Sequence, residues 1–175
     1  MNMVVNGVTN GNFEDFETLL ESELKDKDNY FKLRDMNINF CQGCWECWVK
    51  SPGVCKLKDD YELILKKVPS TKTITIITPV IVGYESYLIK TFSDRMIPIV
   101  QPYIEISKGE QHHVQRYKKN PNYRVIVLED EHTTPEDIDT IKELYERKLL
   151  NFKADLIDVI SLKKGEDYTH VINSI

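Results

Sequence analysis

The stretch from Thr71 to Thr78 constrains the fold of this chain most strongly. It reads Thr-Lys-Thr-Ile-Thr-Ile-Ile-Thr, so every residue except the lysine is β-branched. Such side chains favour strands, and a strand of this kind is typical of the centre of a parallel sheet that is covered on both faces. A second apolar run from Tyr123 to Glu129 predicts another buried strand.

Amphipathic segments alternate with the strands along the chain. Three further strands are expected at 3–5, 30–33 and 154–162, and helices at about 13–25, 59–67, 85–96, 134–150 and within 165–175. Thr134-Pro135-Glu136 is typical of a helix start, with a capping threonine followed by proline at the first helical position. The alternation predicts an α/β fold, a three-layer doubly wound parallel sheet. We expect a single domain over 1–175, with a cysteine loop at 38–58 and a polar insertion at 105–122.

Composition narrows the class of protein. The chain has 175 residues, 41% hydrophobic and 29% charged, which is enough for one domain with a full core. A net charge of -5 offers no basic surplus for nucleic-acid phosphates. No run approaches the ~20 apolar residues of a membrane-spanning helix, and the first residues lack the pattern of a secretory signal. We therefore expect a cytoplasmic protein without nucleic-acid or membrane partners.

The chain has four cysteines, and all of them lie within fifteen residues. Cys41, Cys44, Cys47 and Cys55 are spaced C-x2-C-x2-C-x7-C, with a Pro52-Gly53 turn before the last. This spacing suits four thiolate ligands of a cuboidal iron–sulfur cluster, and it suits structural zinc less well. Redox-active thiols and plain reduced thiols remain alternatives. A disulfide framework is disfavoured in the cytosol.

Two loops follow predicted strands at the edge where doubly wound sheets bind ligands. The polar loop from Asn6 to Phe13 opens a helix, so its N–H groups and side chains could hold a phosphate monoester. It contains no lysine or arginine, and Glu14 and Asp15 follow it. A plain strand–helix turn capped by Asn12 is an equal alternative. The apolar loop 79–84 could contact a flat heterocycle or serve only as a buried connection.

The run from Thr78 to Arg95 resembles the flavin-binding loop and following helix of flavodoxin-like NAD(P)H-dependent FMN reductases. It has the threonine, proline, valine and glycine of that loop, and then a lysine and the Asp94-Arg95 pair. The stretch from Cys41 to Asp60 resembles the cysteine loop of iron–sulfur flavoproteins in the same superfamily. Asn6-Gly7 and Gly11-Asn12 resemble the phosphate loop of the family.

This resemblance implies a flavodoxin-like fold with strand order 2-1-3-4-5, and FMN bound by the two loops within a homodimer or homotetramer. The residues implied to hold the phosphate are Thr9, Asn10, Gly11, Asn12 and Phe13. The residues implied to contact the ribityl chain and the ring are Pro79, Val80, Ile81, Val82, Gly83 and Tyr84. A third loop at 129–132 is implied to approach the ring.

The chain also departs from the family pattern. Phe13 stands where the family usually has threonine, Ile81 where it has an aromatic residue, and the loop 129–132 is acidic and lacks glycine. Asp94-Arg95 reads as structural or interfacial, and His112-His113 as a solvated loop or an oligomer contact more than a metal site.

The function implied is a flavin-dependent oxidoreductase. It would pass electrons from NAD(P)H to a quinone, a free flavin or another small acceptor, with hydride transfer centred on the flavin and no dedicated acid or base. A [4Fe-4S] cluster on the four cysteines could relay single electrons. The alternatives are a non-enzymatic electron-transfer or metal-binding protein, and a degenerate homologue without flavin.

Overall fold

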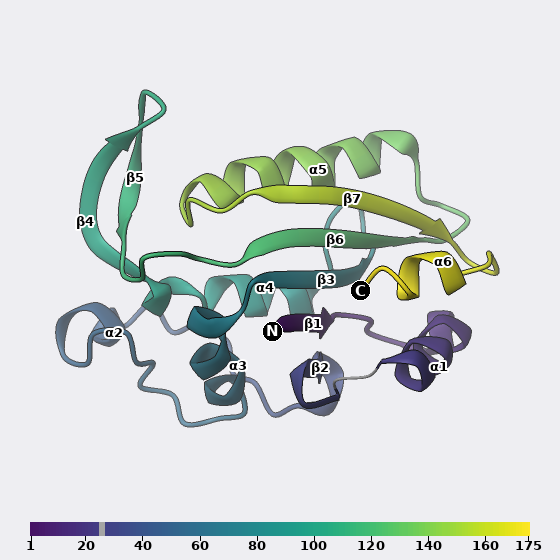
Figure 1. Cartoon of the computed structure of the whole chain (residues 1–175), viewed down its shortest axis with the longest axis horizontal. Helices are drawn as coiled ribbons and strands as arrows, with labels where there is room; N and C mark the ends of the chain where they lie inside the picture. Colours follow the sequence, from purple (N-terminus) through teal and green to yellow (C-terminus); the bar gives the residue numbers. More distant parts are fainter. Residues whose placement is uncertain (25–26) are drawn as a thin grey trace.

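A five-stranded parallel sheet forms the centre of the computed structural model, which describes residues 1–24 and 27–175 (Figure 1). Its strands are β1 (Asn2–Asn6), β2 (Tyr30–Lys32), β3 (Thr73–Pro79), β6 (Asn122–Glu129) and β7 (Leu156–Lys163). They lie in the order β2-β1-β3-β6-β7, and every neighbouring pair is parallel. Counted in chain order within this sheet, the order is 2-1-3-4-5, which confirms the predicted flavodoxin-like fold.

Helices cover both faces of the sheet (Figure 1). On one face, Ile74 and Ile76 of β3 belong to a core cluster that also contains side chains of α3 (Tyr61–Lys67), α4 (Tyr87–Asp94) and α5 (Pro135–Leu150). On the other face, Ile77 packs in a cluster with α1 (Glu14–Glu23) and α6 (Thr169–Ile172). Because side chains alternate along a strand, a central strand buried on both faces must be apolar or β-branched throughout.

The helix starts follow local capping chemistry. Thr134 and Asp137 form a capping box at the start of α5, and Pro135 occupies the first turn, as predicted. The helix expected from residue 85 begins instead at Tyr87, because the Ser86 hydroxyl accepts a hydrogen bond from the Ile89 amide and acts as the N-cap. The helix expected over 13–25 is a short 3-10 turn, Gly11–Phe13, followed by α1; its expected end at Lys25 lies outside the described residues.

A two-stranded antiparallel hairpin follows α4 and extends from the body of the molecule (Figure 1). It consists of β4 (Val100–Ser107) and β5 (Glu110–Gln115), and it occupies most of the segment expected as a polar insertion. Its two-residue turn has positive φ at Lys108 (53°) and Gly109 (80°), which matches the twist of a tight hairpin. Lysine is not a usual residue at such a position, so the sequence carried a weak turn signal.

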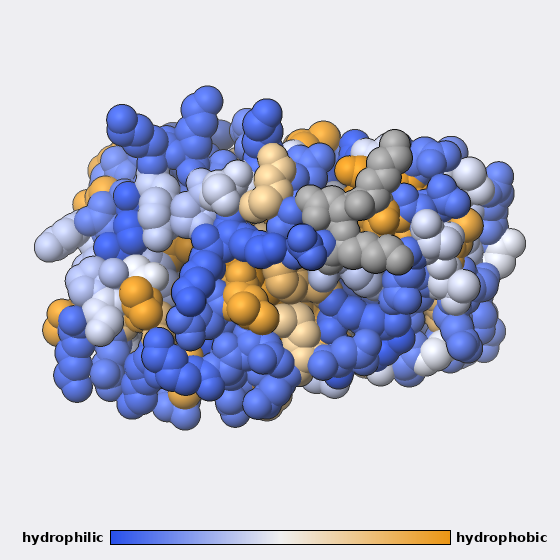
Figure 2. Space-filling view, turned by 60° about the horizontal axis from the view of Figure 1, so that its bottom comes forward, coloured by the Kyte–Doolittle hydropathy of each residue, from blue (hydrophilic) through white to orange (hydrophobic). Residues whose placement is uncertain are grey.

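The remaining short elements are α2 (Glu46–Val49), in the cysteine loop, and 3-10 turns at Lys27–Asn29, Leu33–Asp35, Val68–Ser70 and Ile97–Ile99. In the described part of the chain, the longest helices are too short or too polar to cross a bilayer. The face shown in Figure 2 is mainly hydrophilic, and its hydrophobic side chains lie in small separate groups.

Candidate functional site

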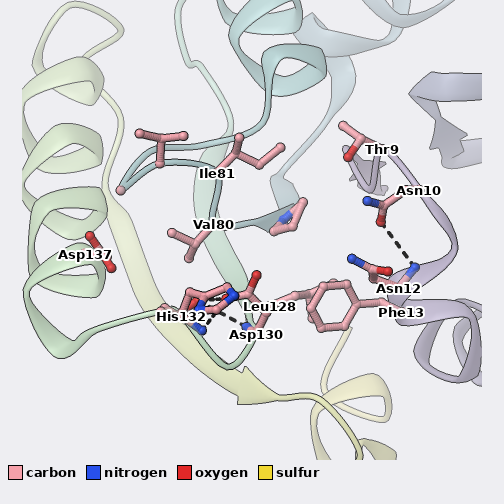
Figure 3. A pocket seen from close by; sticks show the side chains of 14 residues that line it. Thr9, Asn10, Asn12, Phe13, Val80, Ile81, Leu128, Asp130, His132 and Asp137 are labelled. Atoms are coloured by element: carbon pink, nitrogen blue, oxygen red, sulfur yellow. Dashed lines mark hydrogen bonds between the residues drawn. The ribbon is translucent and has the colours of Figure 1, made fainter.

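A cavity of about 460 Å³ lies at the carboxyl ends of β1, β3 and β6 (Figure 3). This volume is in the range of small-molecule sites. Its lining residues are Thr9, Asn10, Asn12, Phe13, Pro79, Val80, Ile81, Val82, Gly83, Leu128, Asp130, His132, Thr133 and Asp137. From β1 the sheet is extended in one direction by β2 and in the other by β3, β6 and β7. The cavity therefore lies at the switch point of the strand order, between β1 and β3.

The two loops singled out from the sequence meet in this cavity. Of their eleven predicted contact residues, Gly11 and Tyr84 are not part of its lining. The third loop also reaches the cavity, through Asp130 and His132, as the resemblance implied. Sequence reasoning missed Leu128, Thr133 and Asp137. Their position follows from the parallel order that the sequence predicts. Because β6 pairs with β3 in parallel, the carboxyl end of β6 must lie beside the loop after β3.

Direct hydrogen bonds hold the first two loops together. The Ser86 hydroxyl donates to the Gly7 carbonyl at 2.7 Å, and the Gly7 amide donates to the carbonyl of Ile77 at 2.8 Å. The Ser86 amide donates to Thr78 Oγ1 at 2.9 Å. A Cβ atom on Gly7 would lie 2.3 Å from Cγ1 of Ile89, so only glycine permits this approach. The spacing of the cavity walls is therefore fixed by packing as well as by hydrogen bonds.

The polar loop 6–13 is held by its own asparagines. Asn6 Oδ1 accepts from the Val8 amide at 2.9 Å, and Asn10 Oδ1 accepts from the Asn12 amide at 3.2 Å. Asn10 therefore caps the short helix that starts at Gly11, which corrects the alternative in which Asn12 is the cap. Both the Asn10 and Asn12 side chains lie at the cavity beside Thr9 (Figure 3). They present amide donors to it.

Among the described residues, the cavity lining carries carboxylates but contains no lysine or arginine. Arg34 lies near the first loop, where its Nη1 donates to the Val8 carbonyl at 3.3 Å. The same nitrogen is 2.6 Å from the buried carboxylate of Glu17, which offsets its charge. Hydrogen bonds from the backbone of His132 and from Thr133 lower the pKa of Asp130. An anionic ligand group would therefore rely on neutral hydroxyl and amide donors.

The acidic residues that follow the first loop do not line the cavity. Glu14 and Asp15 are exposed and are not among its lining residues. They lie in the first turn of α1, where negative charge is favourable to the helix dipole. The repulsion that they could exert on a bound phosphate is consequently screened by solvent.

The apolar loop ends in a tight turn with an unfavourable backbone. Ile81 and Tyr84 bridge across it, while Val82 (φ 52°) and Gly83 (φ 73°) both have positive φ. Val82 is fully exposed, so burial of its side chain does not offset the strain. A β-branched residue in this region is an outlier, and such strain is found preferentially at ligand sites.

A second, smaller pocket collects the four cysteines. It is lined by Cys41, Gln42, Gly43, Cys44, Trp45, Cys47, Cys55, Lys56, Leu57, Asp94, Arg95, Ile97 and Pro98. Positive φ at Gly43 (61°) and Trp45 (58°) bends the loop around this pocket. Trp45 stacks on Trp48 at 4.8 Å between ring centroids, and Trp48 Nε1 donates to the carbonyl of Ile97 at 3.1 Å. Trp48 thus anchors the loop to the 3-10 turn Ile97–Ile99 that follows α4.

The cysteine pocket brings together the four thiols singled out in the sequence. All four thiols are free, and burial together with the other three thiols raises the pKa of Cys47 to about 11. Within residues 1–24 and 27–175, no three His, Cys, Asp or Glu side chains are arranged to hold one metal ion. Four thiols that line one pocket are the donor set that ligates a cuboidal iron–sulfur cluster.

The adjacent residues Asp94 and Arg95 form ion pairs with different partners. Asp94 pairs with Lys90 at the surface. Arg95 is buried and forms a two-pronged ion pair with Asp59, with Nη1–Oδ2 at 2.9 Å and Nη2–Oδ1 at 3.0 Å. The pair connects the end of α4 to the segment that leaves the cysteine loop, which is a structural role.

The two adjacent histidines lie on β5, not on a solvated loop. His112 is 5% exposed, with Nδ1 3.3 Å from Asn151 Oδ1 and Nε2 3.3 Å from Glu110 Oε2. His113 packs against Trp48, with ring centroids 5.0 Å apart. Both therefore help to join the hairpin to neighbouring elements.

Comparison with known proteins gives sequence similarity over part of the chain. No protein-family model matches it. An iron–sulfur flavoprotein of Archaeoglobus fulgidus is 30% identical over 86 residues, which are 46% of this chain and 38% of the relative. An iron–sulfur flavoprotein of Methanocaldococcus jannaschii is 36% identical over 70 residues, which are 40% of this chain and 35% of the relative. The matches thus span little more than a third of each relative's length.

Solved structures match the whole fold at low sequence identity. An FMN-dependent NADH-azoreductase from Bacillus anthracis in complex with FMN has a TM-score of 0.53 and 16% identity, covering 99% of this chain and 92% of that chain. The Trp repressor binding protein from Bacillus subtilis has a TM-score of 0.56 and 13% identity, covering 99% and 94%. The resemblance recognised in the sequence is thereby confirmed: the chain is a flavodoxin-like α/β protein that is similar, over nearly half of its length, to the iron–sulfur flavoproteins.

Proposed function

We propose that this protein binds FMN in the 460 Å³ cavity and uses it to pass electrons from NAD(P)H to a small acceptor such as a quinone or a free flavin. The observation that carries the proposal is the meeting of three strand-end loops at the switch point of a doubly wound sheet, which is where this fold binds mononucleotides. FMN, when bound, supplies a ring that accepts a hydride at N5. The resemblance of the sequence to FMN reductases supports the same reading.

The chain's own residues would bind and orient the cofactor. Thr9, Asn10 and Asn12 offer hydroxyl and amide donors on one side of the cavity, which suit the phosphate tail (Figure 3). Val80 and Ile81 offer an apolar wall on the facing loop, which suits the ring and excludes water from it. The ionised Asp130 keeps negative charge at the cavity, so it disfavours further negative charge there.

We propose further that Cys41, Cys44, Cys47 and Cys55 hold a [4Fe-4S] cluster. The support is that all four thiols line one pocket, together with the partial similarity to iron–sulfur flavoproteins. A cluster would let the protein divide the two electrons of a hydride into single-electron steps. Zinc or free thiols are the outcomes that would replace this assignment.

A homodimer or homotetramer in the cytoplasm is also part of the proposal. Its support is the exposure of large apolar side chains on the cysteine loop and the hairpin, at Val49 (78%), Tyr103 (68%) and Ile106 (70%). A second copy would remove this surface from water. Sedimentation of the purified protein measures the stoichiometry, and a strictly monomeric protein would contradict it.

Anaerobic purification followed by an absorption spectrum tests the cofactors directly. Flavin bands support the FMN site, and a broad brown absorption with iron and sulfide in the protein supports the cluster. Protein that is colourless and takes up no FMN on titration would overturn the proposal. If dithionite reduces the bound groups and neither NADH nor NADPH does, the protein is an electron carrier and not a reductase.

A matched pair of variants tests where the phosphate binds. Thr9→Val removes a donor from the cavity, so we expect it to weaken FMN about tenfold, the worth of one charge-assisted hydrogen bond, and to leave riboflavin unchanged. Thr18→Val changes an exposed residue of α1 and should alter neither affinity. Equal losses for FMN and riboflavin in Thr9→Val would place the phosphate elsewhere.

A further inference from the structure

Arg95 is held rigidly at the wall of the cysteine pocket. Its side chain is 1% exposed, and Nη1 donates to the carbonyl of Asn39 at 2.6 Å as well as to Asp59. The guanidinium lies over the ring of Tyr61, 4.7 Å from its centroid. With both terminal nitrogens and one face engaged, the planar group has a fixed orientation.

The third nitrogen of this guanidinium has no partner within residues 1–24 and 27–175. Nε of Arg95 is buried, and no atom of the described residues accepts a hydrogen bond from it. A buried donor left unpaired costs about 1–3 kcal/mol, and more when it carries charge. The same side chain lines the pocket that contains all four thiols. An acceptor placed in that pocket would satisfy the unpaired donor.

The charge of Arg95 is maintained in this setting. Burial on its own lowers the pKa of Arg95, but the hydrogen bond to the Asp59 carboxylate and charge attraction to Cys55 and Asp59 outweigh it and raise the pKa. Lys56 also lines the pocket, but its side chain is 44% exposed and it pairs with Glu46 at 3.1 Å. Arg95 is the buried one of the two cations that the described residues place at the pocket, so it acts with little screening by solvent.

We propose that Arg95 is a positioning residue for the iron–sulfur cluster, donating from Nε to a cysteine or cluster sulfur and stabilising its reduced form. This inference rests on the cluster of the proposed function. A cluster with four thiolate ligands is anionic, and it gains one more negative charge when it takes up one electron from a reductant. A fixed cation and an N–H···S hydrogen bond stabilise the more negative state. Loss of the cation or of the hydrogen bond therefore lowers the reduction potential of the cluster.

Three variants separate charge from hydrogen bonding. Arg95→Lys keeps the charge and removes the Nε donor, whereas the double variant Asp59→Asn/Arg95→Gln removes both buried charges together and avoids an unpaired carboxylate. Lys56→Gln is the control, because it removes the exposed cation of the same pocket. The readouts are iron and sulfide content after anaerobic reconstitution, the midpoint potential followed by electron paramagnetic resonance, and FMN affinity.

We expect Arg95→Lys to lower the equilibrium constant for reduction about tenfold, which is about 59 mV for a one-electron couple, and the double variant to lower it further. Lys56→Gln should change it less than about twofold, because its cation is exposed. Loss of iron from the Arg95 variants with unchanged FMN affinity also supports the role. Wild-type iron content and potential in both variants would overturn it.

A measurement on the wild-type protein tests the proposal even if the variants do not fold. In protein labelled with ¹⁵N-arginine, the reduced cluster should show a ¹⁵N coupling by pulsed electron paramagnetic resonance, since Arg95 is the one arginine that lines the pocket among the described residues. Absence of that coupling would overturn the inference and leave the cluster in place. Wild-type protein that reconstitutes no iron would overturn the cluster itself, whatever the result for FMN.

Discussion

The hydroxyl of Ser86 donates a hydrogen bond of 2.7 Å to the carbonyl of Gly7 across 79 residues of sequence. This contact joins the loop after β1 to the start of α4, which directly follows the apolar loop, and both loops form walls of the cavity. Ser86 is fully buried, so solvent cannot replace the bond. The relative position of the two loops therefore depends on a glycine and a serine that do not themselves line the cavity.

Gly7→Ala should damage both stability and flavin binding. The added methyl would lie 2.3 Å from Ile89 Cγ1 and 2.8 Å from Ser86 Oγ, so we expect a loss of about 1–3 kcal/mol in the free energy of unfolding. Urea denaturation measures it, and an FMN titration should show weaker binding. Gly11→Ala is the control, because no atom of the described residues lies within 4 Å of the atom it adds. Equal effects of the two substitutions on stability and FMN binding would contradict the role of the Gly7–Ser86 contact in holding the two loops together.

Lys148→Ala should cost far more stability than Arg147→Ala on the same helix. Lys148 Nζ lies 2.8 Å from a carboxylate oxygen of Glu85, which is 3% exposed and also accepts from the Tyr145 hydroxyl at 2.6 Å. Removing one partner of a buried pair costs about 3–5 kcal/mol. Arg147 pairs with Glu110 at the surface, which is worth about 1 kcal/mol or less. Similar urea midpoints for the two variants would show that the Glu85 network contributes little.

Acid should weaken the protein through Asp59. Burial alone would raise the pKa of this carboxyl, but hydrogen bonds from Arg95 and Asn39 outweigh it and lower the pKa from 3.8 to about 2. The stabilisation is therefore complete above about pH 4 and is lost as the pH falls from 4 towards 2, amounting to about 2 kcal/mol. Urea midpoints measured between pH 2 and 6 should fall less steeply in Asp59→Asn than in the wild type. Parallel curves would contradict the assignment.

Val82→Gly should stabilise the free protein. The substitution relieves a φ of 52° that costs a β-branched residue about 1–2 kcal/mol, against about 0.5–1 kcal/mol for the greater entropy of glycine in the unfolded chain. We expect a small rise in the melting temperature. Gly83→Ala is the opposite control, because it places a Cβ at φ 73° and 2.9 Å from Asp137 Oδ1. A lower melting temperature for Val82→Gly would show that the Val82 side chain contributes in a way its exposure does not reveal.

The sheet and its main helices could be predicted because their causes are local. The β-branched run gave β3 to within two residues, and the Thr134-Pro135 start of α5 was recovered at its cap. The hairpin was missed because β5 contains only one aliphatic residue among its six, and because its turn begins with Lys108, a residue that seldom adopts positive φ.

The site could be predicted only as far as its loops. Their meeting follows from the parallel order of β1, β3 and β6, so nine of the eleven residues named from the sequence line one cavity. The pairing of Arg95 with Asp59 could not be read from the chain, because 36 residues separate them and the adjacent Asp94 was an equally plausible partner. Such contacts depend on how α4 packs against the cysteine loop.

Strand β3 lies between β1 and β6, and from Ile74 to Pro79 all of its residues are buried. Backbone amides in such a place exchange with heavy water only when the molecule opens globally, whereas amides in exposed turns exchange through small local fluctuations. We therefore expect slow exchange of the backbone amides of β3 at the base of the cavity. Amides of the exposed turn around Val82 should exchange quickly. A ligand entering the cavity would meet a rigid base and an exposed rim at Val82 that can adjust to the ligand's shape.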